Sequence, residues 1–174
     1  SFYNDPAAPG GSAGGVNPSF LLPPFDGIFP GLGYDSWYTI GIEFAPSGSE
    51  TAISAVESAF QPWIGSFDAT SAMSGQSILM NDVTGGAWYV LNGTPNGLPD
   101  PANQRVLIAQ VTTDGDISGI INAQVFVNGV GGNDLRPRFV FEGTGTFFHS
   151  EPAVTGCTNP DACNFDDTAN EDDG

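Results

Sequence analysis

The segment ISGIINAQVFV, residues 117–127, carries the clearest structural pattern in this chain. From Ile121 to Val127 apolar side chains alternate with polar ones, and only Phe126 breaks the alternation. A period of two predicts a strand with one buried and one wet face, as in an antiparallel sheet. Residues 105–113 form a second strand candidate, and Asp114-Gly115 between the two supplies tight-turn residues. We therefore predict a hairpin from 105 to 127.

Other segments rich in aromatic and β-branched residues extend this pattern to most of the chain. We predict strands at 35–44, 76–80, 87–91, 138–142 and 146–149, each bounded by turn residues. Pro137 favours an edge position for the strand at 138–142. Many short strands, together with 24 Gly and 14 Pro, predict an all-β fold, an antiparallel β-sandwich or jelly roll.

One segment, residues 49–60, has the period of a helix instead. Ile53, Val56 and Phe60 recur at spacings of three and four, Ser49 is a candidate N-cap, and Pro62 is a stop signal. We predict one short helix here.

Composition divides the chain into three parts: an arm at 1–33, the β-sandwich at 34–152 and an acidic linker at 153–174. The arm is rich in Gly and Pro, which argue against a helix or a central strand, so we expect it to be extended. It either packs on its own domain or docks onto a neighbouring molecule. Its large apolar residues are Phe20, Leu21, Leu22, Phe25, Ile28, Phe29 and Leu32.

Charge excludes some classes of function. The chain has 20 acidic residues against 3 basic ones and a net charge of -17, so it lacks the basic patch that nucleic acid requires. No apolar run is long enough for a membrane span. The single histidine, His149, has no recognisable catalytic partners in the sequence, and we expect no enzymatic activity.

Two aromatic pairs, Trp37-Tyr38 and Trp88-Tyr89, each lie within a predicted strand. Adjacent strand residues point to opposite faces, so one ring of each pair could face outward and form a platform for a glycan. The alternative is that the tryptophans fill the core while the tyrosines cover the sheet edge.

The linker holds both cysteines, Cys157 and Cys163, which are close enough for a local disulfide and too few for a zinc site. Free thiols are the alternative. Six acidic residues in this span repel one another unless they are solvated or bridged by a cation, and calcium suits such oxygen ligands. The candidate calcium ligands are Asp161, Asn164, Asp166, Asp172 and Asp173.

Residues 156–174, GCTNPDACNFDDTANEDDG, resemble a short repeat of large secreted or surface-anchored proteins of marine Bacteroidota, roughly Gly-Cys-Thr-Asp-x-x-Ala-Cys-Asn-Tyr-Asp, followed by an acidic stretch and Ser-Cys. The resemblance covers about a tenth of the chain. Asn159 and Phe165 depart from the repeat, and the final Ser-Cys is missing. The missing third cysteine leaves the disulfide pairing open: Cys157 or Cys163 pairs with the other or with a cysteine beyond Gly174, unless both are free thiols.

In that family the repeats connect domains, often upstream of a signal for type IX secretion. The resemblance implies an extracellular, multi-domain protein of adhesive or structural role. It also makes Thr168, within Asp167-Thr168-Ala169, a candidate for O-glycosylation. The chain starts at Ser1 without Met, and we expect it to be a segment of a longer polypeptide.

The sequence thus supports two hypotheses. The first is an extracellular structural or adhesive module, a filament subunit or a repeat of a long surface protein, that self-associates or contacts neighbouring modules through its apolar arm. The second is a carbohydrate-binding β-sandwich module that uses the aromatic pairs.

Overall fold

The structure, a computed structural model of the chain, describes residues 1–4, 30–132, 134–150, 155–157, 159 and 171–172. Within these ranges the regular structure is short strands and 3-10 helices, and the longest helix spans 5 residues. The protein is therefore all-β in class, as the sequence predicts. Its chain divides into two compact units, Ser1–Gly115 and Asp116–Gly174, and this division lies inside the single domain predicted at 34–152.

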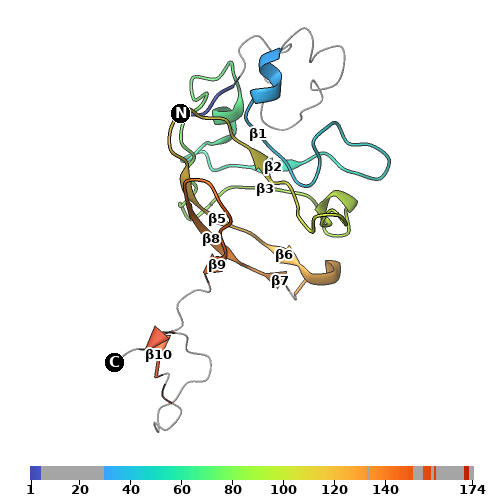
Figure 1. The fold of residues 1–174 in the computed structure, drawn as a ribbon, viewed down its shortest axis with the longest axis vertical. Coiled ribbons are helices and arrows are strands. Elements are labelled where there is room, and N and C mark those ends of the chain that lie inside the picture. The colour runs from blue at the N-terminus through green and yellow to red at the C-terminus, as the bar shows by residue number, and fades with distance from the viewer. Residues whose placement is uncertain (5–29, 133, 151–154, 158, 160–170, 173–174) are drawn as a thin grey trace. The chain divides into compact units, whose positions relative to one another are not determined.

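The described residues of unit 1, which spans 1–115, form two antiparallel sheets of two strands each; β1, β2 and β3 are labelled in Figure 1. In the first, Trp37 lies opposite Gln110; in the second, Ala55 lies opposite Trp88. Its elements are η2 Pro30–Tyr34, β1 Trp37–Tyr38, β2 Ser54–Val56, η3 Ile64–Phe67, β3 Ala87–Tyr89, η4 Pro95–Gly97 and β4 Ala109–Gln110.

Unit 2, residues 116–174, is built around a sheet of three antiparallel strands in the order β5-β8-β9. Two smaller sheets, the antiparallel β6-β7 and the parallel β10-β11, accompany it. Its elements are β5 Ser118–Asn122, β6 Val125–Phe126, η5 Val127–Gly129, β7 Asp134–Leu135, β8 Arg138–Glu142, β9 His149–Ser150, β10 Thr155–Gly156 and β11 Glu171–Asp172.

The aromatic core of unit 1 combines residues from two strands, a 3-10 helix and a loop. Trp63 is completely buried, and its ring centroid lies 5.0 Å from that of Tyr38 and 5.5 Å from that of Trp88. Phe67 in η3 packs edge-on to Tyr38 at 5.2 Å. Tilted and edge-to-face contacts at these distances are the favoured geometries for aromatic pairs. Large rings thus supply the burial that short strands alone do not.

Residues 1–4 are bound to unit 1 rather than extended away from it. The Phe2 N–H donates to the Gly75 carbonyl at 3.0 Å, and the Tyr3 N–H donates to the Thr112 carbonyl at 2.7 Å. The Phe2 ring also packs against Phe67 at 5.0 Å. At the other end of the predicted arm, residues 30–34 form the short helix η2, where the prolines led us to predict none. Of the apolar arm residues, 20–29 lie outside the described residues, as does the side chain of Leu32.

The predicted helix at 49–60 is wrong. Residues 54–56 form β2, with Ala55 half-buried between exposed neighbours, and the Phe60 side chain is 89% exposed. Two side chains bond the backbone in place of helical hydrogen bonds: Asn96 Oδ1 accepts from the Thr51 N–H at 3.3 Å, and a Glu57 carboxylate oxygen accepts from the Trp63 N–H at 2.8 Å. The helical spacing of apolar residues here was coincidental.

The predicted hairpin from 105 to 127 is also wrong. β4 pairs with β1, and β5 pairs with β8, so the two predicted arms belong to different sheets. The Asp114-Gly115 turn does not adopt the left-handed conformation that a primed turn needs, because Gly115 has no positive φ. Instead, this dipeptide lies at the boundary between the two units.

The strand at 138–142 is confirmed with its predicted bounds as β8. Its predicted edge position is wrong, because β8 lies between β5 and β9. Pro137 precedes the strand, where its missing N–H breaks no ladder bond, and its carbonyl accepts from the Ala123 N–H at 2.9 Å. From Ile121 to Gln124 the predicted alternation holds, since Ile121 and Ala123 are half-buried and Asn122 is exposed, but Val125, predicted on the buried face, is exposed.

The buried position of Tyr38 makes a pH dependence of stability testable. Burial, with a smaller contribution from the negative charge of Glu57, raises the pKa of Tyr38 to about 12 from 10.0. The folded state therefore holds this proton more tightly than the unfolded state does. The stabilisation is present below about pH 10 and is lost as the pH rises toward 12, by roughly 2–3 kcal/mol. Urea unfolding at about pH 8 and pH 11.5 measures it.

Tyr38→Phe should remove the loss of stability that the Tyr38 hydroxyl causes between about pH 10 and 12. Tyr89→Phe, at an exposed position on β3, should leave that loss unchanged. An equal alkaline loss in Tyr38→Phe and in the unmodified chain would contradict this assignment.

Candidate functional site

The aromatic pairs do not form the predicted platform. Trp37 and Tyr38 are both buried, so their strand contributes no outward ring. Trp88 is half-buried, and its indole N–H donates to the carbonyls of Thr39 and Ile108, both at 3.1 Å. Tyr89 is the exposed member of the two pairs. The period-two argument fails here because β1 is covered on both faces.

The predicted linker site lies largely beyond what the structure describes. Asp161, Cys163, Asn164, Asp166, Thr168 and Asp173 lie outside the described residues. Asp172 falls in β11, which pairs with β10, and nothing further is defined for its side chain. Cys157 has a free, half-buried thiol. Among the described residues no group of three or more His, Cys, Asp or Glu side chains could hold a metal ion.

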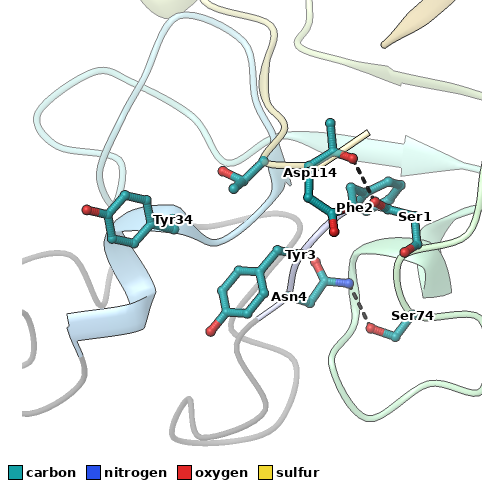
Figure 2. A pocket seen from close by; sticks show the side chains of 9 residues that line it. Ser1, Phe2, Tyr3, Asn4, Tyr34, Ser74 and Asp114 are labelled. Atoms are coloured by element: carbon teal, nitrogen blue, oxygen red, sulfur yellow. Dashed lines mark hydrogen bonds between the residues drawn. The ribbon is translucent and has the colours of Figure 1, made fainter. Parts of the chain in front are cut away.

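A groove that the sequence did not predict lies in unit 1, where residues 1–4 cross it (Figure 2). We call it the N-terminal groove. It is open to solvent and has a volume of about 670 Å³, and its lining includes Tyr3, Asn4, Tyr34, Ser74, Thr113 and Asp114. These residues come from separate segments of the chain, so only the folded unit brings them together.

Hydrogen bonds fix the floor of the N-terminal groove. The buried Asn4 side chain donates through Nδ2 to the Ser66 carbonyl and to Ser74 Oγ, both at 2.8 Å. The Thr113 hydroxyl donates to the Ser1 carbonyl at 2.9 Å. These bonds connect residues 1–4 to two loops of unit 1 and give the groove a defined shape.

A second candidate surface lies in unit 2, on one face of the paired strands β5 and β8. Ile120 lies opposite Val140, and their side chains are 53% and 49% exposed. The same face carries Ser118 opposite Glu142 and Asn122 opposite Arg138, all exposed. We call these six residues the β5–β8 face.

The opposite face of the sheet is better covered. Phe141 packs against Phe147 with ring centroids 6.1 Å apart, and both are half-buried. Gly119 permits this packing, because a Cβ at that position would lie 2.8 Å from the Phe141 ring. Nevertheless, none of the described side chains of unit 2 is buried, whereas unit 1 has a buried aromatic core.

Comparison of the chain with protein families, curated proteins and solved structures finds no match. The described helices are all too short to cross a membrane. The two surfaces are therefore the features from which a function can be inferred.

Proposed function

We propose that this chain is an extracellular structural or adhesive module that associates with neighbouring copies or modules through the β5–β8 face. The observation that carries the proposal is the exposed Ile120–Val140 pair on a sheet of a unit without buried described side chains. A sheet is stable when one face is buried against another layer. A neighbouring sheet of the same kind supplies such a layer.

Charge supports a second copy as the neighbour. Arg138 and Glu142 lie at opposite ends of β8, on the same face as Val140. A two-fold axis across the strands sets Arg138 of one copy opposite Glu142 of the other, with Val140 near the centre. Such self-complementarity is the property that a symmetric dimer contact requires. The β-sandwich predicted from the sequence is, in this proposal, completed by two sheets from neighbouring copies.

The extracellular part of the proposal is supported by the resemblance of residues 156–174 to the repeat of Bacteroidota surface proteins. A surface with a net charge of -17 suits a salty or calcium-rich medium, in which the charges are screened. Calcium binding by the acidic linker, a disulfide involving Cys157 or Cys163, glycosylation of Thr168 and assembly through the apolar arm remain proposals.

Association should weaken when the β5–β8 face is made polar. We expect Ile120→Thr with Val140→Thr to weaken self-association of the full chain about tenfold or more, because two apolar side chains are lost from each copy. Sedimentation velocity over a concentration series, with and without calcium, measures this. Val56→Thr is the matched control, since Val56 is also a strand valine, 50% exposed, but in unit 1.

Charge reversal provides a second test of the same contact. Arg138→Glu alone should weaken association, and Arg138→Glu with Glu142→Arg should restore it, because the opposite charges face each other again. A variant with serine at all seven apolar arm positions shows, in the same sedimentation experiment, whether the arm contributes to self-association. A chain that stays monomeric at all concentrations, or one whose association only the arm variant lowers, would refute the role of the β5–β8 face.

A further inference from the structure

The N-terminal groove has the dimensions of a ligand site. Its volume of about 670 Å³ lies within the roughly 300–1,000 Å³ typical of small-molecule pockets. Its walls come from loops that are tied together by the bonds of Asn4 and Thr113. Most of the groove is therefore formed before any ligand arrives, although Asn4 Oδ1 is buried beneath its surface.

Two tyrosines present their rings at this groove. Tyr34 is 67% exposed and Tyr3 is 40% exposed. In Figure 2 the two rings project from different segments, Tyr34 from η2 and Tyr3 from the N-terminal segment. Exposed tyrosines combine an apolar ring face with a polar hydroxyl, and this suits a ligand that has both kinds of surface.

The polar groups of the groove narrow the class of ligand. Its described lining contains hydroxyls, an amide and the carboxylate of Asp114, but no Lys, Arg or His. Among the described lining residues the cationic group is the α-amino group of Ser1, and the carboxylate of Asp114 offsets it, so the groove offers an anionic ligand no net attraction. Asn4 Oδ1 is buried and has no hydrogen-bond partner among the described residues, and Figure 2 shows it directed away from Ser74. Such an acceptor is satisfied when a ligand hydroxyl donates to it.

We propose that the N-terminal groove binds a neutral carbohydrate. The sugar ring stacks its C–H face on Tyr34 and Tyr3, while its hydroxyls bond to Asp114, Thr113 and, after a small opening of the groove, Asn4 Oδ1. Weak C–H contacts to ring faces and several hydroxyl bonds together explain why aromatic, amide and carboxylate side chains occur in one groove. This site uses none of the four aromatic residues singled out in the sequence, and it does not depend on assembly through unit 2.

Binding of defined oligosaccharides to the full chain tests the proposal. The probes are neutral hexoses, namely cellohexaose, laminarihexaose, maltohexaose and mannohexaose, with an oligogalacturonate as the anionic comparison. Isothermal titration calorimetry should detect binding of at least one neutral probe and none of the anionic one. Tyr34→Ala should weaken that binding about tenfold, and Tyr34→Phe, which keeps the ring, should largely retain it.

Tyr89→Ala is the matched control, because Tyr89 is exposed on β3 and does not line the N-terminal groove. It should leave the affinity unchanged. The proposal is overturned if no neutral probe binds, if the oligogalacturonate binds instead, or if Tyr89→Ala weakens binding as much as Tyr34→Ala does. Far-UV circular dichroism of each variant verifies that the chain remains folded, and since Tyr34 is mostly exposed, its replacement should not unfold unit 1.

Discussion

Replacing Trp63 by alanine is expected to lower the free energy of unfolding of unit 1 by about 3–5 kcal/mol. The indole is completely buried and packs against Tyr38, Phe67 and Trp88. Its N–H also donates to the Val56 carbonyl at 3.0 Å. The substitution therefore leaves a cavity and removes a hydrogen bond at once.

Chemical denaturation followed by circular dichroism measures this loss. Phe60→Ala is the control, because Phe60 lies three residues away in the chain and is almost completely exposed; its replacement should change stability by less than about 0.5 kcal/mol. Similar losses in both variants would contradict the placement of Trp63 at the centre of the core.

Gly41→Ala should be nearly as damaging, for a reason that lies in the backbone. Gly41 has a φ of +68°, and a Cβ there would collide with the main-chain carbonyl of Asn96. The buried Asn96 side chain donates to the carbonyls of Ile40 and Thr51, both at 3.1 Å, so moving it breaks bonds that hold two loops together. We expect a loss of about 2–5 kcal/mol in denaturation experiments.

Replacing Gly48 by alanine distinguishes the strain of a positive φ from the collision with the Asn96 carbonyl. It has a φ of +59°, but a Cβ at Gly48 meets no atom within 4 Å. Gly48→Ala therefore introduces only the strain of a left-handed alanine, about 1–2 kcal/mol. If both variants lose the same amount, the contact with Asn96 contributes nothing and the described approach of these loops is wrong.

Local sequence pattern predicted the strands of unit 2 better than those of unit 1, for a physical reason. β8 alternates exposed and half-buried residues over its whole length, and its half-buried side chains, Phe139 and Phe141, face the same side of the sheet. In unit 1 the core residues Ile42, Ile53 and Trp63 lie in loops, where no period connects burial to sequence. The periodicity of apolar residues reveals burial in helices and strands, but it cannot reveal which loop residues are buried.

Pairing over long sequence distances explains the other differences. Turn residues at Asp114-Gly115 favour a local hairpin, yet Ala109 pairs with Tyr38. Side chains such as Asn96 and Glu57 bond backbone groups elsewhere in the chain and thereby exclude the helix that spacing alone predicts. Neither the long-range strand pairing nor these side-chain bonds to the backbone can be predicted without knowing the folded structure.

The N-terminal groove could not be found from sequence for the same reason. Tyr3 and Asn4 precede a Gly- and Pro-rich stretch that suggests an unanchored terminus, and their partners are Ser74 and Thr112, distant in sequence. A signal existed only in composition: two tyrosines and an asparagine in segments otherwise dominated by small residues and proline. The exposed Ile120–Val140 pair, in contrast, follows directly from the alternation of two strands once their pairing is known.

The neighbouring, tilted indoles of unit 1 also have a spectroscopic consequence. Trp63 and Trp88 lie 5.5 Å apart with their planes inclined by 48°, close enough for their electronic transitions to couple. Such exciton coupling produces paired bands of opposite sign in the circular dichroism spectrum, and these vanish when the rings separate. Unit 1 thus contains an intrinsic optical probe of its own core, and unit 2, which has no tryptophan, contributes no indole band in the near ultraviolet, where peptide groups do not absorb. One spectrum can therefore follow the unfolding of the first unit without any label, whatever the second unit does.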